Sequence, residues 1–393
     1  MKKYFILIAA ILIMVCLGGI YGFSMFVPPL KADYGLTTAQ TQVIFGFTVI
    51  SFAVSMVFSG RLLQKLNPKI VGVSSALLFS GGYLIASFSR GNFILLILGL
   101  GILSGSGIGF GYACSLTIPI KWFPSFKGLI TGLSVAGFGG GAILMSQLAK
   151  LFLEKDLEVL FIFRIIAISY GVVIFLSAIL ISYPPPDQAQ PEKIAYLSLS
   201  RMLKEKILWY LFGIMFTGTF TGLLIIGNLK LLGLSYGASE FYATLAISLF
   251  AAGNSSGRII WGRIIDSKGG RFTIPLALIF LSLSLLLLLT FAGHNILLII
   301  ITFLVGLGFS ANFVLFATEI SNIYGVENLG GLYPFVHLSY GIAGIISPII
   351  GGWLFDINGS YLVSIIIAAS ISALGAILYL TTSRKIIKPS RTY

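Results

Sequence analysis

The sequence predicts an all-α membrane protein with twelve transmembrane helices. Hydrophobic residues make up 57% of the 393 residues and charged residues only 9%, so polar groups are too few to cover a water-soluble globule. Twelve apolar stretches, each about 20 residues or more and thus able to span a ~30 Å hydrocarbon core, are separated by short polar breaks. Continuous apolar runs such as residues 296–301 lack the alternation that a transmembrane β-strand requires.

The first apolar stretch follows Lys2 and Lys3, as in a signal peptide, but it continues to Val27 and has Val15 directly before Cys16. We therefore expect it to remain as the first helix. The expected helices are residues 5–29, 41–60, 70–88, 92–118, 129–151, 159–182, 208–229, 241–262, 273–292, 295–318, 332–354 and 360–381.

The formal net charge of +13 is distributed unevenly along the chain. Eighteen of the 25 lysines and arginines fall in segments on the same side as the N-terminus, and six fall in the opposite loops and outer helix ends. Arg258 alone lies in an expected helix away from its outer end. The positive-inside rule then predicts a multi-pass plasma-membrane protein with both termini in the cytoplasm. This distribution argues against nucleic acid as a partner.

The longest polar segment, residues 183–206, divides the chain into two similar halves. We expect an N-terminal six-helix bundle at residues 1–183, a cytoplasmic linker at 184–206 and a C-terminal six-helix bundle at 207–393. Gly60-Arg61 after the second helix corresponds to Gly262-Arg263 after the eighth. Internal repetition of this kind is typical of secondary transporters, and it predicts two pseudo-symmetric bundles.

The second copy of the repeated loop matches the pattern Gly-x-x-x-Asp-x-x-Gly-x-Arg through Gly262, Asp266, Gly269 and Arg271. This resembles the cytoplasmic loop motif of the major facilitator superfamily. The first copy has Gln64 and Asn67 in place of the Asp and the second Gly. Only the second copy is therefore expected to support a charge network.

Narrower matches lie at residues 19–24, 121–124 and 340–344. These segments are similar to the oxalate:formate antiporter family and to its relatives, the monocarboxylate transporters, which include bacterial lactate carriers. The resemblance covers essentially the whole chain. It implies the major facilitator fold and alternating access around a midplane site.

Arg258 is the most informative residue. A charge inside a membrane helix costs about 2.5 to 3.5 kcal/mol on insertion scales, and the nearest acidic candidate is Glu319, at the cytoplasmic end of the tenth helix. A carboxylate substrate would supply a countercharge through a bidentate contact, and arginine at this place resembles the carboxylate-binding arginine of the family. The alternative is a structural arginine held by Glu319, backbone carbonyls or cavity water.

Asn254 lies one turn before Arg258, on the same helix face. It is expected to orient the arginine, to bond the substrate, or only to bond a neighbouring helix. Proton-coupled monocarboxylate carriers of animals have Asp at this position. Because the Asn254 side chain does not titrate, we do not expect it to carry the coupled proton. Those carriers also have a lysine in helix one, where this chain has Phe23.

The eleventh helix bears on whether the substrate has one carboxylate or two. The oxalate carrier of the family has a lysine where this chain has Tyr340. That carrier therefore has two positive charges for its substrate, whereas this chain has only Arg258. We expect Tyr340 to donate a hydrogen bond to a monocarboxylate oxygen. His337, one turn earlier, is expected either to carry a proton near neutral pH or to satisfy a neighbouring helix.

Three further side chains are weaker candidates. Tyr112 follows a run of glycines in the fourth helix, and its hydroxyl either reaches the cavity or is buried in packing. Asn312 and Phe313 in the tenth helix are candidates for a polar and an aromatic wall, although aromatic residues at such spacing usually pack.

Nothing in the sequence indicates an enzyme. His294 and His337 are the only histidines, so no zinc-ligand cluster is present, and the glycine run at 105–111 lies in a membrane span rather than between a strand and a helix. We expect no cofactor and no metal. The expected partners are a small organic anion, protons and the lipid bilayer, with the chain acting as a monomer.

Together these features favour a carrier of a small monocarboxylate such as lactate or pyruvate, by proton symport or anion exchange. The alternative substrate is a dicarboxylate such as oxalate, with protonated His337 as the second charge. A membrane sensor that has kept the fold is a third hypothesis, but the loop at 183–206 and the tail from Ser383 are too short for a signalling domain.

Overall fold

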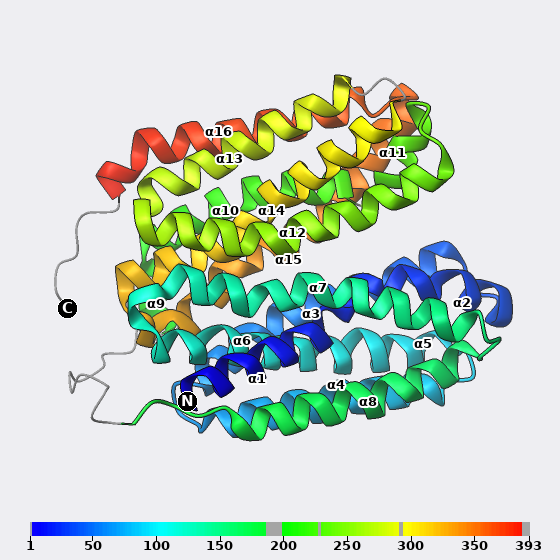
Figure 1. The fold of residues 1–393 in the computed structure, drawn as a ribbon, viewed down its shortest axis with the longest axis horizontal. Coiled ribbons are helices and arrows are strands. Elements are labelled where there is room, and N and C mark those ends of the chain that lie inside the picture. Colours follow the sequence, from blue (N-terminus) through cyan, green and yellow to red (C-terminus); the bar gives the residue numbers. More distant parts are fainter. Residues whose placement is uncertain (1, 186–198, 227–228, 291–293, 387–393) are drawn as a thin grey trace. The chain divides into compact units, whose positions relative to one another are not determined.

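The structure, a computed structural model, describes residues 2–185, 199–226, 229–290 and 294–386, and these residues form helices without any strand (Figure 1). Most of the linker expected at 184–206 lies outside the described residues. The first elements are α1 (Lys2–Leu17), η1 (Gly18–Phe26), α2 (Val27–Tyr34), α3 (Thr38–Leu62), α4 (Pro68–Ser87), α5 (Phe93–Leu96), η2 (Ile97–Ser104), α6 (Gly105–Trp122), η3 (Pro124–Phe126), α7 (Lys127–Leu153) and α8 (Val159–Leu180). The later elements are α9 (Leu199–Lys204), α10 (Lys206–Ile226), α11 (Leu229–Ser235), α12 (Glu240–Lys268), α13 (Gly270–Leu287), η5 (Leu288–Thr290), α14 (Asn295–Tyr324), α15 (Val326–Asn358) and α16 (Leu362–Ile386).

Eleven helical segments of the described chain are long and apolar enough to cross a membrane. The eighth expected span corresponds to α12, which is 29 residues long but is not among the eleven. Its hydropathy is lowered by polar and charged residues such as Asn254, Arg258 and Arg263. The helix that departs from the apolar pattern is therefore the one that carries the buried arginine.

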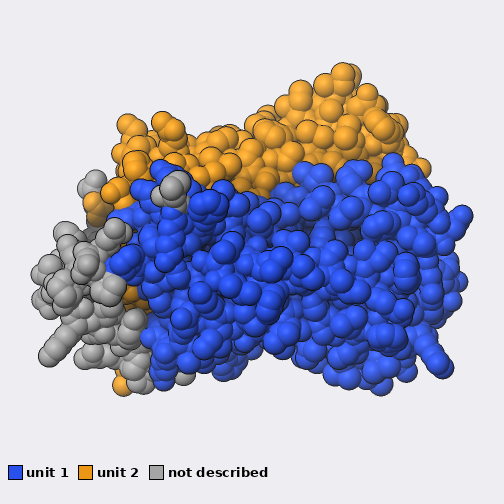
Figure 2. Space-filling view, turned by 60° about the horizontal axis from the view of Figure 1, so that its bottom comes forward, with its two compact units in different colours: residues 1–124, 137–194 blue, residues 125–136, 195–393 orange. Residues whose placement is uncertain are grey.

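Contacts divide the chain into two compact units, coloured separately in Figure 2. Unit 1 comprises residues 1–124 and 137–194, and unit 2 comprises residues 125–136 and 195–393. Helix α7 is thus divided, because its first ten residues pack with unit 2 and the rest with unit 1. A division into six and six helices at the linker remains a prediction.

Two segments of unit 1 depart from α-helical geometry. The first expected span continues from α1 into the 3₁₀ segment η1, and η2 in the fourth expected span is a π-helix. Glycines allow close backbone approach at both places. A Cβ on Gly18 would lie 1.9 Å from the Phe138 carbonyl oxygen of α7, and one on Gly82 of α4 would lie 2.5 Å from the Gly99 carbonyl oxygen of η2.

Helices α12 and α14 of unit 2 also pack through small residues. A Cβ on Gly253 would lie 2.1 Å from the Phe303 carbonyl oxygen, and one on Gly306 would lie 2.2 Å from the Phe250 carbonyl oxygen. Close backbone approach replaces the hydrophobic driving force that lipid does not supply. This packing fixes α12 against α14 at the level of the buried arginine.

We therefore expect Gly253→Val to destabilise the folded protein, because the added side chain meets backbone that cannot move away, at a cost of about 1 to 3 kcal/mol or more. The monodisperse fraction in size-exclusion chromatography and the melting temperature should both fall. Gly213→Val in α10 is the matched control, since a Cβ there meets nothing within 4 Å. Equal behaviour of the two variants would contradict the close packing of α12 on α14.

Candidate substrate site

The Arg258 side chain lies in the interior of unit 2, only 1% exposed. Its Nε donates to the Asn254 side-chain oxygen, one turn earlier on α12, at 3.3 Å, and one of its terminal nitrogens donates to the Val135 carbonyl in the first part of α7. The guanidinium carbon lies 4.9 Å from the centroid of the Phe313 ring of α14, a cation–π contact. Two neutral oxygens and an aromatic face thus surround part of this charge.

The Phe313 ring connects Arg258 to aromatic residues of α15. Its centroid lies 5.2 Å from that of Tyr340 and 5.9 Å from that of His337, and the latter two rings are 5.2 Å apart. The Tyr333 hydroxyl contacts His337 Nδ1 at 3.2 Å and donates to the Phe313 carbonyl oxygen at 3.3 Å. A mixed aromatic and polar cluster from α12, α14 and α15 is therefore linked to the guanidinium through the Phe313 ring.

Five of the seven candidate side chains come together in this cluster: Arg258, Asn254, Phe313, His337 and Tyr340. Tyr333 was not among the residues predicted from the sequence, although it stands one turn before His337 on the same helix. The spacing of four residues was the signal available for finding it.

Asn312 of unit 2 lies outside this cluster, and Tyr112 is described within unit 1. The Asn312 amide nitrogen donates to the Phe309 carbonyl oxygen at 2.9 Å, and the amide faces α10, where a Cβ on Gly218 would lie 2.1 Å from its side-chain oxygen. Tyr112 belongs to unit 1, where it is 1% exposed and its ring lies 5.2 Å from the rings of Phe52 and Phe138. Packing within their own units accounts for both positions.

Glu319, the acidic residue considered as a partner for Arg258, has contacts at another place. Its carboxylate accepts a hydrogen bond from the Tyr379 hydroxyl of α16 at 3.3 Å. It also lies at the start of α13, where a Cβ on Gly270 would be 1.9 Å from Glu319 Oε2. A carboxylate at a helix N-terminus interacts favourably with the helix dipole. Glu319 is therefore expected to stabilise the start of α13.

The motif expected in a loop lies largely in the last turns of α12, which extends to Lys268, and it joins that helix to the start of α7. Asp266 accepts hydrogen bonds from the backbone nitrogens of Gly128 at 2.7 Å and Leu129 at 2.8 Å. A Cβ on Gly262 would lie 2.3 Å from the Gly128 carbonyl oxygen, so this glycine permits the approach. Gly269, at φ +75°, separates α12 from α13 in a backbone conformation that suits glycine.

The degenerate first copy of the motif has a different local role. Asn67, in the place of the second glycine, caps α4 by accepting a hydrogen bond from the Lys69 backbone nitrogen at 3.0 Å. Pro68 follows at the first helical position, where its missing N–H costs nothing.

Among the described residues, no group of three His, Cys, Asp or Glu side chains is arranged to hold a metal ion.

An all-helical chain whose described residues include eleven segments long and apolar enough to cross a membrane belongs to the class of polytopic membrane proteins. The family model of the Major Facilitator Superfamily matches residues 9–235 and 211–392, so the chain belongs to this superfamily. A crystal structure of the superfamily transporter FucP in its outward conformation aligns with a TM-score of 0.74 at 16% identity, covering 99% of this chain and 100% of that one. It supports the fold that the sequence predicted.

Three relatives have informative names. The oxalate:formate antiporter of Oxalobacter formigenes is 24% identical over 376 residues, covering 93% of this chain and 88% of that protein. Apicoplast pyruvate carrier 1 of Toxoplasma gondii is 24% identical, with 70% and 63% covered. Monocarboxylate transporter 12 of Mus musculus is 23% identical, with 84% and 74% covered.

The Asp266 contacts should protect the first turn of α7 from amide exchange. In Asp266→Ala, the backbone nitrogens of Gly128 and Leu129 lose their acceptors, so hydrogen–deuterium exchange of a peptide covering residues 127–131 should accelerate. Asp266→Asn retains one carbonyl oxygen and should have an intermediate effect. Ser267→Ala, at the exposed neighbouring position, should leave exchange at 127–131 unchanged, and acceleration there as well would contradict the specific role of Asp266.

Proposed function

We propose that this protein is a secondary active transporter of a small monocarboxylate, with lactate and pyruvate as the model substrates, and that Arg258 binds the carboxylate. The observation that carries the proposal is the buried guanidinium in contact with Asn254 and Phe313, with His337 and Tyr340 packed on the Phe313 ring. A guanidinium fork matches the geometry of a carboxylate. The amide, phenol and imidazole add directional hydrogen bonding, and Phe313 adds an apolar wall.

The names of the relatives support the same class of substrate. They mention oxalate, formate, pyruvate and monocarboxylates, all small organic acids. Because this chain has Tyr340 and not a basic residue in the cluster, a single permanent positive charge lies there. A singly charged acid matches that charge better than a doubly charged one.

Proton symport is the coupling that we propose. Asn254 cannot titrate, whereas His337 lies beside Phe313 and Tyr340 and its Nδ1 contacts the Tyr333 hydroxyl, so it is the residue we assign to proton transfer. Carriage of one proton with one monoanion moves no net charge. We further propose that the protein acts as a monomer in the plasma membrane with both termini in the cytoplasm, as its basic loops indicate.

Removing the guanidinium should abolish binding of the acid. We expect Arg258→Ala to reduce lactate or pyruvate counterflow in proteoliposomes by at least about a hundredfold, since a charge-assisted bidentate pair is lost. Arg258→Lys should retain little activity because an ammonium lacks the planar fork. Arg263→Gln, an exposed arginine of the same helix, is the matched control and should transport normally. Undiminished counterflow in well-folded Arg258 variants would refute the anchoring role.

Proton coupling is tested by imposing gradients on proteoliposomes. Inward proton gradients should drive uphill accumulation of the acid without detectable charge movement on a supported-membrane electrode. Variant His337→Gln should still exchange labelled for unlabelled acid but should no longer accumulate it against its gradient. Accumulation that is independent of the proton gradient would favour anion exchange over symport.

Exchange of oxalate for formate is the second candidate function, because His337 stands in the same cluster and adds a second charge when protonated. Oxalate uptake would then fall as pH rises through the titration of the histidine, and His337→Gln would lose oxalate before formate. A preference for monoanions at every pH would count against this alternative.

A further inference from the structure

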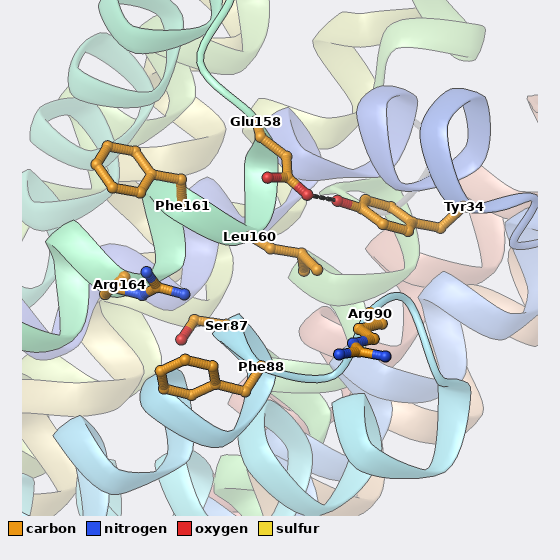
Figure 3. Close-up of a pocket in the computed structure, with 8 residues that line it drawn as sticks. All are labelled: Tyr34, Ser87, Phe88, Arg90, Glu158, Leu160, Phe161 and Arg164. Carbon is orange, nitrogen blue, oxygen red and sulfur yellow. Dashed lines mark hydrogen bonds between the residues drawn. The ribbon is translucent and has the colours of Figure 1, made fainter.

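A pocket outside the Arg258 cluster lies at one end of unit 1, where the α2 end, the turn after α4 and the start of α8 meet (Figure 3). It encloses about 440 Å³. Its lining residues are Tyr34, Ser87, Phe88, Arg90, Glu158, Leu160, Phe161 and Arg164. Two guanidiniums and a carboxylate thus face one small cavity at the level where two membrane helices end or begin.

Arg164 lies inside the apolar span of α8, five residues after Val159, and is only partly exposed. Its guanidinium carbon lies 4.5 Å from the Phe88 ring centroid and 6.0 Å from that of Phe161. Its Nε is buried and has no hydrogen-bond partner among the described residues. A cation at this depth favours an anionic group that can reach it from the membrane interface.

Glu158 faces the same pocket from the residue before α8, and its carboxylate accepts a hydrogen bond from the Tyr34 hydroxyl. Burial and this carboxylate raise the pKa of Tyr34, so the hydroxyl remains a donor at neutral pH. In the described part of the chain, no ion pair joins Glu158 to Arg90 or Arg164. Charges of both signs therefore line one cavity without neutralising each other in direct contact.

A second depression of about 580 Å³ shares the Tyr34 and Glu158 wall. It is lined by Asp33, Asp156 and Glu158, with Leu153 and Leu157. One side of the Tyr34–Glu158 pair is thus basic and the other is acidic. This arrangement matches a ligand that has an anionic and a cationic group next to each other.

The backbone around the two depressions adopts uncommon conformations. Arg90 at φ +51° and Asp156 at φ +56° are the non-glycine residues with positive φ in the described chain, which costs on the order of 1 kcal/mol each. One of them lines each depression. Gly91 lets Tyr34 approach, because a Cβ there would lie 2.4 Å from the tyrosine ring.

We propose that this end of unit 1 binds the phosphoethanolamine headgroup of a membrane lipid. The phosphodiester binds Arg90 and Arg164, and the ammonium binds the Glu158 carboxylate on the side of the acidic depression. Ammonium donates hydrogen bonds to a carboxylate, which the trimethylated ammonium of a choline headgroup cannot do. An anionic headgroup without an ammonium would satisfy only the arginines.

The surroundings favour a lipid over a soluble zwitterion. Phe88 is 65% exposed and Phe161 42% exposed at the rim of the pocket, as expected for aromatic residues at a membrane interface. The two helices leading from the rim present exposed apolar side chains along which acyl chains can lie: Leu77 and Ile85 of α4, and Ile168, Val172 and Leu176 of α8. The charged pocket and the apolar faces together fit an amphiphile.

The test is lipid binding by the purified full-length protein, measured by native mass spectrometry with phosphatidylethanolamine, phosphatidylcholine and phosphatidylglycerol of identical chains. The protein should retain phosphatidylethanolamine most strongly. Arg164→Gln should weaken it about tenfold through loss of a charge-assisted contact, and Arg90→Gln, on an exposed turn, should act in the same direction. Glu158→Gln should reduce binding of phosphatidylethanolamine but not of phosphatidylglycerol, and so abolish the preference.

Lys150→Gln and Glu154→Gln are the matched controls, since these residues form an exposed ion pair of 3.7 Å near the end of α7, outside both depressions. Both should bind the lipid as the parent protein does. Absence of a headgroup preference, or parental binding in the arginine variants, would overturn the proposal. Soluble phosphoethanolamine should not displace the lipid; binding as tight as that of the lipid would identify a solute site instead.

Discussion

The burial of the Arg258 guanidinium constrains three helices of unit 2. Arg258 is 1% exposed, and inserting such a charge costs about 2.5 to 3.5 kcal/mol. Hydrogen bonds to a charged group contribute about 1.5 to 3 kcal/mol each and a desolvated cation–π contact about 2 kcal/mol. The contacts with Asn254, Val135 and Phe313 are therefore of the size needed to offset the cost. They also require α7, α12 and α14 to remain in register.

The sequence was sufficient to predict the helices because lipid leaves few alternatives to an apolar helix of membrane-spanning length. It was less informative about irregular helices, since η1 and the π-helix η2 depend on where glycines of separate helices meet. It also gave no sign that residues 125–136 pack with unit 2. That grouping arises from tertiary contacts such as those of Asp266 with the start of α7.

Helical periodicity is informative within one helix and much less so between helices. It placed Asn254 and Arg258 on one face, and they are in contact. It could not determine that Phe313 faces the arginine while Asn312, the adjacent residue, faces Gly218 of α10. The pocket with Arg90, Arg164 and Glu158 was beyond sequence analysis for the same reason, because three separate segments form it.

The partners of Arg258 also bear on how binding of a substrate is linked to movement of a helix. The Val135 carbonyl occupies one guanidinium donor, and α7 packs closely on α12 at this point, since a Cβ on Gly132 would lie 2.3 Å from the Arg258 carbonyl oxygen. On the proposed function, a carboxylate bound to Arg258 would share the guanidinium with Asn254 and with the Val135 carbonyl of α7. The position of the first part of α7 would then affect how Arg258 is oriented toward the substrate.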